Sequence, residues 1–173
     1  MGTPKGDLVL DGVRLVDRAI ATLRSGGCEP VIAVVRAGVS ADGAVVNPDP
    51  ARGLRSSLEI GIDATEVAGT GAVEAVAVLL ADLPGVSAQA VASVCAAWRP
   101  GRITVAVYDG VRGHPIVMEP RLWREAIAMA EPDEGARALQ RARPDLVDEV
   151  GVDGDPVDLD TPADVDRWRA REA

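Results

Sequence analysis

The chain alternates between two hydrophobic patterns, one with helical spacing and one continuous. Over residues 11–27, apolar side chains recur every three or four positions from Val13 to Leu23, and two glycines end the segment. This spacing predicts an amphipathic helix. Residues 29–38 form a short, continuously apolar run, which is typical of a buried parallel strand.

The same alternation continues to the end of the chain. Further strands are expected at residues 73–81, 102–110, 114–120, 146–152 and 156–159. Further helices are expected at residues 56–67, 87–98, 121–130, 133–143 and 161–173. This order predicts a three-layer α/β fold with a mostly parallel sheet. No repeat or linker divides the sequence, so residues 1–173 are expected to form a single domain.

The order of elements leaves the predicted sheet without a first strand. A parallel sheet of this type usually opens with a central strand, yet the first predicted element, from about Gly12, is a helix. We therefore expect the domain to be truncated at its N-terminus. Either its natural start lies upstream of Met1, or the chain lacks this part of the fold. Lys5 stands out in this opening segment, because it is the only lysine among 18 lysines and arginines.

Composition and charge exclude several classes of partner. Hydrophobic residues make up 47% of the chain, which predicts a globular protein whose core consists of Val, Ala, Leu and Ile. A net charge of −9 argues against binding to nucleic acid or to an anionic membrane. The longest apolar runs are far shorter than a membrane span, and no signal segment opens the chain. We expect a cytoplasmic protein in which Cys28 and Cys95 are buried free thiols.

Carboxylates near the ends of predicted strands are the first candidates for chemistry. Asp82 directly follows a buried strand, and ligands bind beyond the carboxyl ends of strands in open α/β sheets. Asp158 and Asp160 alternate with apolar residues, so both are expected on one strand face. Together these acids predict a site for a hard cation. In the alternative interpretation, Asp82 caps a turn, and the other two acids interact favourably with the dipole of the next helix.

That next helix carries its own start signal. Thr161 is predicted as the N-cap, Pro162 as the first helical residue and Asp164 as the acid of a capping box.

Two further segments carry candidate binding residues. Gly53, Ser56 and Ser57 precede or open a predicted helix, where backbone amides and hydroxyls can bind an anion, although many helices begin with serine. The turn at residues 108–114 holds the only tyrosine and the only histidine between two predicted strands. His114 is expected near the site, and its alternative role is structural. No arrangement of residues indicates nucleophilic hydrolysis.

The order of six short motifs resembles the MobA-like nucleotidyltransferase family, and most closely its molybdenum cofactor cytidylyltransferases. The motifs are "MGTPK", "NPDPARGLRSSLEIGI", "LLADLPGV", "YDGVRGHPIVM", "DEGAR" and "DLDTPADV". The resemblance implies a Rossmann-like nucleotide-diphospho-sugar transferase fold. It implies Mg²⁺-dependent transfer of a nucleotidyl group, with CMP favoured, from CTP or GTP to the phosphate of a molybdopterin. A molybdoenzyme or its chaperone would be the protein partner.

The resemblance also assigns roles to individual residues. Lys5 matches the family's phosphate-binding lysine, and Asp82 matches a metal ligand that acts with Asp160 or Asp158. The resemblance places Gly53, Ser56 and Ser57 on the nucleotide side. The acceptor side would consist of Tyr108, Arg112, Gly113, His114 and Arg137.

One part of the family signature is missing. In the family, a first strand and a glycine-rich loop precede the Met-Gly-x-Pro-Lys motif, and this sequence holds only the motif. Three alternatives to transfer onto a molybdopterin therefore stay open. They are a nucleotidyltransferase with a different phosphate acceptor, a catalytically inactive or regulatory protein, and a glycosyltransferase that uses the Asp-x-Asp triplet at residues 158–160.

Overall fold

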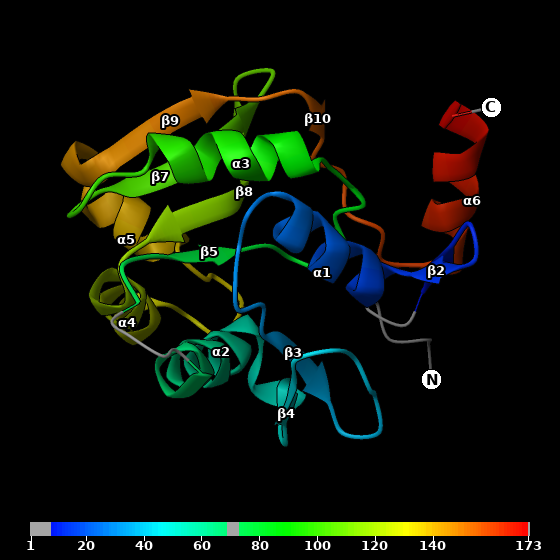
Figure 1. Ribbon diagram of the computed structural model, residues 1–173, viewed down its shortest axis with the longest axis horizontal. Coiled ribbons are helices and arrows are strands. Elements are labelled where there is room, and N and C mark those ends of the chain that lie inside the picture. The colour runs from blue at the N-terminus through cyan, green and yellow to red at the C-terminus, as the bar shows by residue number, and fades with distance from the viewer. Residues whose placement is uncertain (1–7, 69–72, 173) are drawn as a thin grey trace.

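The core of the protein is a four-stranded sheet in the order β5-β8-β7-β9. A computed structural model describes residues 8–68 and 73–172 (Figure 1). The strands are β5 (Val76–Val78), β8 (Val111–Met118), β7 (Ile103–Tyr108) and β9 (Val147–Gly151). β8 runs antiparallel to both of its neighbours, whereas β7 and β9 are parallel.

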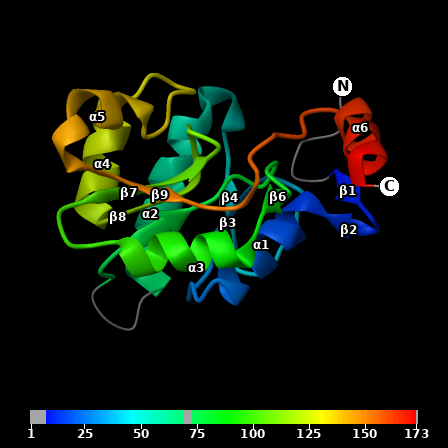
Figure 2. The same cartoon turned by 90° about the horizontal axis from the view of Figure 1, so that it is seen from above.

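Helices cover both faces of this sheet, which gives the three layers that the sequence predicts (Figure 2). On one face, α3 (Ala88–Ala97) contributes Val91 and Val94 to a core with Ala106 and Val117. The opposite face packs against α2 (Leu54–Ala68), α4 (Pro120–Met129) and α5 (Arg137–Ala142).

A second, smaller sheet consists of β3 (Ala33–Arg36) and β4 (Ala44–Asn47), which are parallel. A 3₁₀ turn, η2 (Pro50–Arg52), leads from β4 into α2. Among the described residues, β3 pairs with β4 alone, and β5 pairs with β8 alone. The smaller sheet is therefore not hydrogen-bonded to the larger one within the described part of the chain.

The N-terminal part opens with a tight hairpin of β1 (Val9–Leu10) and β2 (Val13–Arg14). Asp11 and Gly12 form its turn with φ of 52° and 80°, so both lie in the left-handed region. Helix α1 (Leu15–Ser25) follows directly. The prediction that this helix starts near Gly12 is therefore wrong. The helix starts at Leu15, because a short hairpin occupies the residues before it.

The C-terminal segment returns to this hairpin. β10 (Gly154–Asp155) pairs antiparallel with β6 (Gly85–Val86), and α6 (Pro162–Glu172) packs Val165 and Trp168 against Leu8 and Leu10. The short 3₁₀ turn η3 (Pro144–Leu146) precedes β9.

The observed elements confirm the predicted α/β class and correct several details. Residues 156–159, predicted as a strand, belong to no sheet in the described structure. β5 covers only part of the expected strand over residues 73–81, and β4 was not predicted. None of the helices in residues 8–68 and 73–172 combines the length and hydrophobicity needed to cross a lipid bilayer.

Candidate functional site

The acidic part of the predicted site lies where the loop after β5 meets the segment after β10. The backbone N–H of Leu159 donates a 2.8 Å hydrogen bond to the carbonyl of Asp82. The Oδ1 atom of Asp82 is buried. Leu159 is only 1% exposed, and its anchoring side chain separates the exposed residues Asp158 and Asp160. The structure therefore brings the two predicted acidic segments together, although Asp158 and Asp160 do not lie on a strand.

The start of α6 fixes the position of the second acidic segment. The N–H of Thr161 donates to Asp164 at 2.7 Å, and the N–H of Asp164 donates to Thr161 Oγ1 at 3.3 Å. This is the predicted capping box, and it is confirmed. The N–H of Asp160 also donates to Asp164, at 3.2 Å, so the cap holds the backbone of the predicted ligand.

The acids suit a magnesium ion of the kind that binds together with substrate phosphates. Among the described residues, no group of three or more His, Cys, Asp or Glu side chains could hold a metal by itself. Mg²⁺, however, usually takes only one or two carboxylates and completes its shell with waters and phosphates. Asp82 with Asp160 or Asp158 would supply such a pair of oxygen ligands, so the residues present fit the cation.

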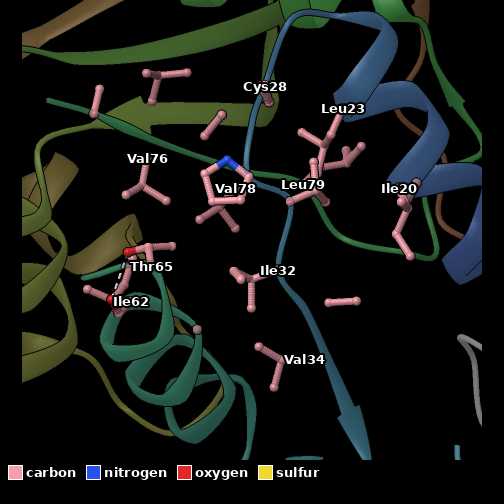
Figure 3. A pocket seen from close by; sticks show the side chains of 18 of the residues that line it. Ile20, Leu23, Cys28, Ile32, Val34, Ile62, Thr65, Val76, Val78 and Leu79 are labelled. Atoms are coloured by element: carbon pink, nitrogen blue, oxygen red, sulfur yellow. Dashed lines mark hydrogen bonds between the residues drawn. The ribbon is translucent and has the colours of Figure 1, made fainter. Parts of the chain in front are cut away.

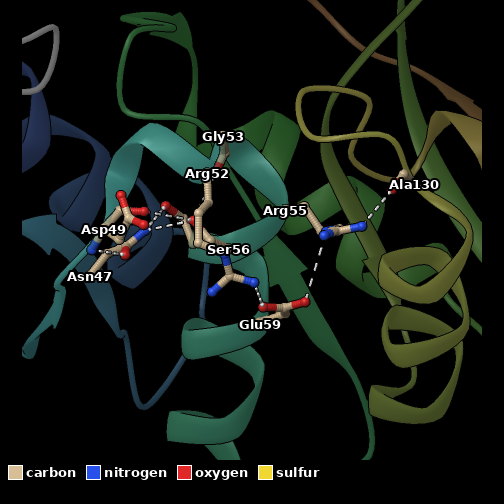
Figure 4. A network of polar contacts seen from close by, with 9 residues as sticks. Asn47, Asp49, Arg52, Gly53, Arg55, Ser56, Glu59 and Ala130 are labelled. Carbon is tan, nitrogen blue, oxygen red and sulfur yellow. Dashed lines mark hydrogen bonds and ion pairs between the residues drawn. The ribbon is translucent and has the colours of Figure 1, made fainter.

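A buried asparagine, which the sequence analysis missed, ties β4 to the start of α2 (Figure 4). Asn47 is 2% exposed, and its Nδ2 donates to the hydroxyls of Ser56 at 2.9 Å and Ser57 at 3.0 Å. Its Oδ1 accepts from the N–H of Asp49 at 3.0 Å. Ser56 itself is 1% exposed and donates to the carbonyl of Gly53. Ser56 therefore holds the loop in place, while Ser57 is only partly buried.

The predicted anion site at the start of α2 is partly filled by the protein itself. Gly53 has φ of +81°, and a Cβ atom there would lie 2.6 Å from both Asp133 Oδ1 and the carbonyl of Pro132. The N–H of Leu54 donates to Asp133 Oδ1 at 3.3 Å, and that of Arg55 donates to the carbonyl of Pro132 at 2.9 Å. A phosphate at this helix start would have to share or displace these contacts.

The turn between β7 and β8 is built around Tyr108. Its hydroxyl donates a 2.6 Å hydrogen bond to the carbonyl of His114, and a Cβ atom on Gly113 would lie 3.1 Å from its ring. Burial raises the pKa of Tyr108 to about 12, so this hydroxyl stays protonated. The aspartate in the turn, Asp109, has φ of 49° and is followed by Gly110.

His114 joins this turn to the end of β5. Its Nδ1 lies 3.1 Å from the carbonyl of Val78, four residues before Asp82. Burial lowers the pKa of His114, and the positive charge of Arg137 lowers it further, while the contact with Val78 opposes both. The histidine is therefore neutral at pH 7.

Two of the predicted site residues, Arg112 and Lys5, are not placed with the others. Arg112 donates to Glu149 of β9 at 2.6 Å, in a half-exposed ion pair on the surface of the sheet. It alternates along β8 with Gly113, which faces Tyr108, so Arg112 lies on the opposite sheet face. Lys5 lies outside the described residues, and its role in phosphate binding stays a prediction.

The two cysteines, distant in sequence, are neighbours in the fold. Their sulfur atoms are 3.9 Å apart, and both are free thiols with partial burial. A hydrogen bond from Cys95 lowers the pKa of Cys28 to about 7. The same contact, together with burial, raises the pKa of Cys95.

Comparison with known proteins identifies a family and a relative that this chain resembles. The MobA-like NTP transferase domain matches residues 1–147. Nicotine blue oxidoreductase of Paenarthrobacter nicotinovorans is 33% identical over 174 residues, covering 94% of this chain and 83% of that protein.

Solved structures agree on the fold. A nucleotidyl transferase from Methanothermobacter thermautotroptrophicus has a TM-score of 0.79 at 18% identity, over 96% of this chain and 84% of that one. Rv0371c from Mycobacterium tuberculosis H37Rv, in complex with manganese, has a TM-score of 0.75 at 25% identity, over 96% and 91% of the two chains. The fold is thus the nucleotide-diphospho-sugar transferase fold, and the chain belongs to the MobA-like family of nucleotidyltransferases.

Proposed function

We propose that this protein transfers a nucleotidyl group, with CMP favoured, from an NTP to the phosphate of a molybdopterin cofactor and releases pyrophosphate. The observation that carries the proposal is the contact between the loop of Asp82 and the segment of Asp158 and Asp160. It joins two acidic segments at the carboxyl end of β5, where open α/β sheets bind ligands.

The chemistry requires charge neutralisation and alignment more than proton removal. A phosphate acceptor is already ionised near neutral pH, so no strong general base is needed. Mg²⁺, when bound, would neutralise charge on the reacting phosphates. Asp82 and Asp160, or Asp158, would hold that ion, and the capping box of α6 would fix the second carboxylate in place.

The remaining predicted residues would align the two substrates. Lys5 would bind nucleotide phosphates as a compact cation, and Ser57 and Gly53 would border the nucleotide. On the acceptor side, Tyr108 and Gly113 shape the turn, and His114 presents a neutral ring. Arg137 would then be the cation that attracts the acceptor's phosphate, since Arg112 is paired with Glu149 on the other sheet face.

A radiochemical assay tests the proposal. The protein is incubated with labelled CTP or GTP, Mg²⁺ or Mn²⁺, and a molybdopterin acceptor, and released pyrophosphate is measured. Asp82→Asn should lower the rate by about 100-fold or more, because even loss of residues that only orient metal ligands costs about 10–100-fold. The matched control is Asp63→Asn on α2, an exposed acid paired with Arg124, which should keep the rate.

Two measurements locate the second ligand and the acceptor. Asp158→Asn and Asp160→Asn, assayed side by side, should differ, with the larger loss expected for Asp160. Arg137→Gln should raise the KM for the acceptor more than the KM for the nucleotide. Full turnover by Asp82→Asn, with an unchanged urea midpoint, would contradict the assignment of Asp82.

A second candidate function is oxidation–reduction of an organic substrate. It is favoured by the 33% identity to nicotine blue oxidoreductase over nearly the whole chain. The assay separates the two, because nucleotidyl transfer requires an NTP and releases pyrophosphate, whereas a redox reaction proceeds without either. A nucleotidyltransferase with another acceptor would release pyrophosphate only with that acceptor. A catalytically inactive protein would support neither reaction.

A further inference from the structure

The thiols of Cys28 and Cys95 are in contact, although the two residues lie 67 positions apart in the sequence. Cys28 lies on the turn between α1 and β3, and Cys95 lies in the last turn of α3. Their sulfur atoms are 3.9 Å apart, within hydrogen-bonding distance for sulfur. The proposed nucleotidyl transfer gives neither thiol a role, so the pair is a candidate for separate chemistry.

The local backbone fixes the position of Cys28. Its N–H donates a 3.0 Å hydrogen bond to the carbonyl of Leu23, which anchors the turn to the end of α1. The chain turns at Gly27, whose φ of 91° lies in the left-handed region that favours glycine. The thiol of Cys28 is therefore carried by a defined turn.

A close approach between this turn and α3 positions the second thiol. Gly26 packs so tightly on α3 that a Cβ atom there would lie 2.5 Å from Val91 Cγ1. Val91 precedes Cys95 by four residues, so both lie on the same face of α3. The packing that requires a glycine at position 26 therefore also brings the face of α3 that carries Cys95 against the turn of Cys28.

The pair is close enough to form a disulfide bond and is open to small reagents. A disulfide joins two sulfur atoms at about 2.05 Å, so these atoms need to approach by about 1.9 Å, a movement within the reach of side-chain rotation. Both thiols are only partly buried, and both line an apolar cavity of about 820 Å³ (Figure 3). A small oxidant can therefore reach them.

The contact gives the two thiols different chemical characters. The hydrogen bond from Cys95 lowers the pKa of Cys28 to about 7, whereas the same contact, together with burial, raises the pKa of Cys95. At pH 7 about half of Cys28 is therefore thiolate, against only a few per cent of an ordinary cysteine. Cys28 is the nucleophile of the pair, and Cys95 keeps its proton.

We propose that Cys28 and Cys95 form a dithiol site that a hydroperoxide oxidises reversibly to an intramolecular disulfide. The thiolate of Cys28 attacks the peroxide and its O–O bond breaks. Cys28 becomes a sulfenic acid, and the leaving oxygen takes a proton from water. The sulfur of Cys95 then displaces the hydroxyl group from Cys28, and this group leaves as water with the thiol proton of Cys95. Two thiols lose two electrons and two protons, and the peroxide gains them.

The disulfide would restrain one half of the candidate site. The segment between the two cysteines contains β3, β4 and α2, and with them the predicted nucleotide residues Gly53, Ser56 and Ser57. Oxidation would tie the start of this segment to α3, which packs on the larger sheet. In a reducing compartment such a bond is transient and serves as a sensor of oxidant. The proposal requires neither nucleotide nor metal, so it is independent of the proposed function.

Peroxide treatment of the folded, reduced chain tests the proposal. With a small excess of hydrogen peroxide, the chain should lose the mass of two hydrogen atoms, and peptide mapping should find Cys28 linked to Cys95. Dithiothreitol should reverse the change. No other thiol competes, because the chain has only two cysteines. The oxidised form should have a Tm about 5–10 °C higher, since the bond closes a long loop in the unfolded chain.

Two single variants separate attack from resolution. Cys95→Ser should block the disulfide and leave Cys28 as a sulfenic acid, which dimedone traps. In the matched variant Cys28→Ser, dimedone should label Cys95 at least 10-fold less. In the reduced, unmodified chain, iodoacetamide at pH 7 should alkylate Cys28 at least 10-fold faster than Cys95.

The same measurements can overturn the proposal. Peroxide treatment that leaves both thiols free, or that links two chains instead, would reject the intramolecular disulfide. Bond formation at the same rate in urea would also reject it, because the fold would then contribute nothing to the reaction. Equal labelling by dimedone in the two single variants would reject Cys28 as the nucleophile.

Discussion

The four-stranded sheet and the β3–β4 pair use similar Val- and Ala-rich strands, but they are supported differently. In the larger sheet, β7 and β8 each pair on both edges, and helices cover both faces. In the smaller sheet, two of the four β4 residues are exposed, and Val46 is 51% exposed. Stability should therefore concentrate in the larger sheet, while the β3–β4 pair depends on its packing against α2.

The same division separates the two halves of the candidate site. The predicted nucleotide residues Gly53, Ser56 and Ser57 follow β4, whereas Tyr108 and His114 belong to the larger sheet. The relative position of the two substrates then depends on how firmly the smaller sheet is docked.

The largest expected effect is the difference in unfolding free energy lost when the core of each sheet is mutated. Trp123 is 1% exposed and donates to the carbonyl of Val76, so Trp123→Ala should cost about 3–5 kcal/mol of unfolding free energy. Val35→Ala in β3 removes two methyl groups from the small core that β3 shares with α1 and should cost only about 1–2 kcal/mol. Urea unfolding followed by circular dichroism measures both. Equal losses would mean that the two sheets form one cooperative core.

A smaller effect is expected at the junction of β4 and α2. Asn47→Ala leaves the buried hydroxyl of Ser56 and the partly buried hydroxyl of Ser57 without their donor and should cost about 1–3 kcal/mol. Hydrogen exchange should quicken at the start of α2 and remain unchanged in β7. The control is Ser57→Ala, which keeps the contact between Asn47 and Ser56 and should cost less. Faster exchange in β7 would instead show that this junction supports the larger sheet.

Local sequence patterns correctly predicted strands with a continuous run of buried residues and helices with regularly spaced apolar residues. The apolar run of β7 and the helical spacing of α2 and α4 identified these elements, because their side chains pack against a complete neighbour. β4 was missed because it is short and two of its four residues are exposed, so its sequence does not show a buried run. The expected strand over residues 73–81 shortened to Val76–Val78, whose far edge has no strand partner among the described residues.

Other errors came from signals that were present but misread. Asp11 and Gly12 are flanked by apolar residues, a strong hairpin signal, yet they were assigned to the start of a helix. At the site, strand ends indicated Asp82, and the cap motif located Asp160. Asn47 could not be found in this way, because its role depends on a contact with a helix nine residues later. The blocking of the α2 start by Asp133 is also a long-range contact that no local pattern contains.

The pH dependence of stability tests the junction of β8 and β5. His114 has a lowered pKa in the folded protein, so below its ordinary value of 6.5 the unfolded chain takes up a proton that the folded chain resists. Its neutral form stabilises the fold above pH 6.5, and this contribution is lost as pH falls further. His114→Gln should therefore flatten the fall of the urea midpoint between about pH 7 and pH 5.

The control for this titration is the thiol of Cys28, whose pKa is about 7. The measurement is repeated with Cys28→Ser in both backgrounds. Since His114 is the only histidine, an unchanged pH profile in His114→Gln would show that it is protonated as readily in the folded protein as in the unfolded one.

The smallest effect is expected at the opposite edge of the larger sheet, where β9 is held by charge. Asp148 accepts from Arg102 Nε at 2.9 Å and from Arg99 Nη2 at 3.0 Å, and the pair with Arg102 is the main reason that its pKa is lowered from 3.8 to about 2. Because the folded-state pKa is the lower one, this contribution is complete above about pH 4 and is lost as pH falls through 2.

Asp148→Asn should lower the unfolding free energy at pH 7 by only about 1 kcal/mol, because water and salt screen a pair this close to the surface. The difference from the unmodified protein should shrink as pH falls from 4 towards 2, and it should also shrink in 1 M salt. Exchange at β9 amides should quicken while β3 amides stay unchanged, because β9 and β3 belong to separate sheets. A difference that persists at pH 2 would mean that Asp148 stabilises the edge strand by packing, and that the larger sheet owes its cohesion to apolar contacts alone.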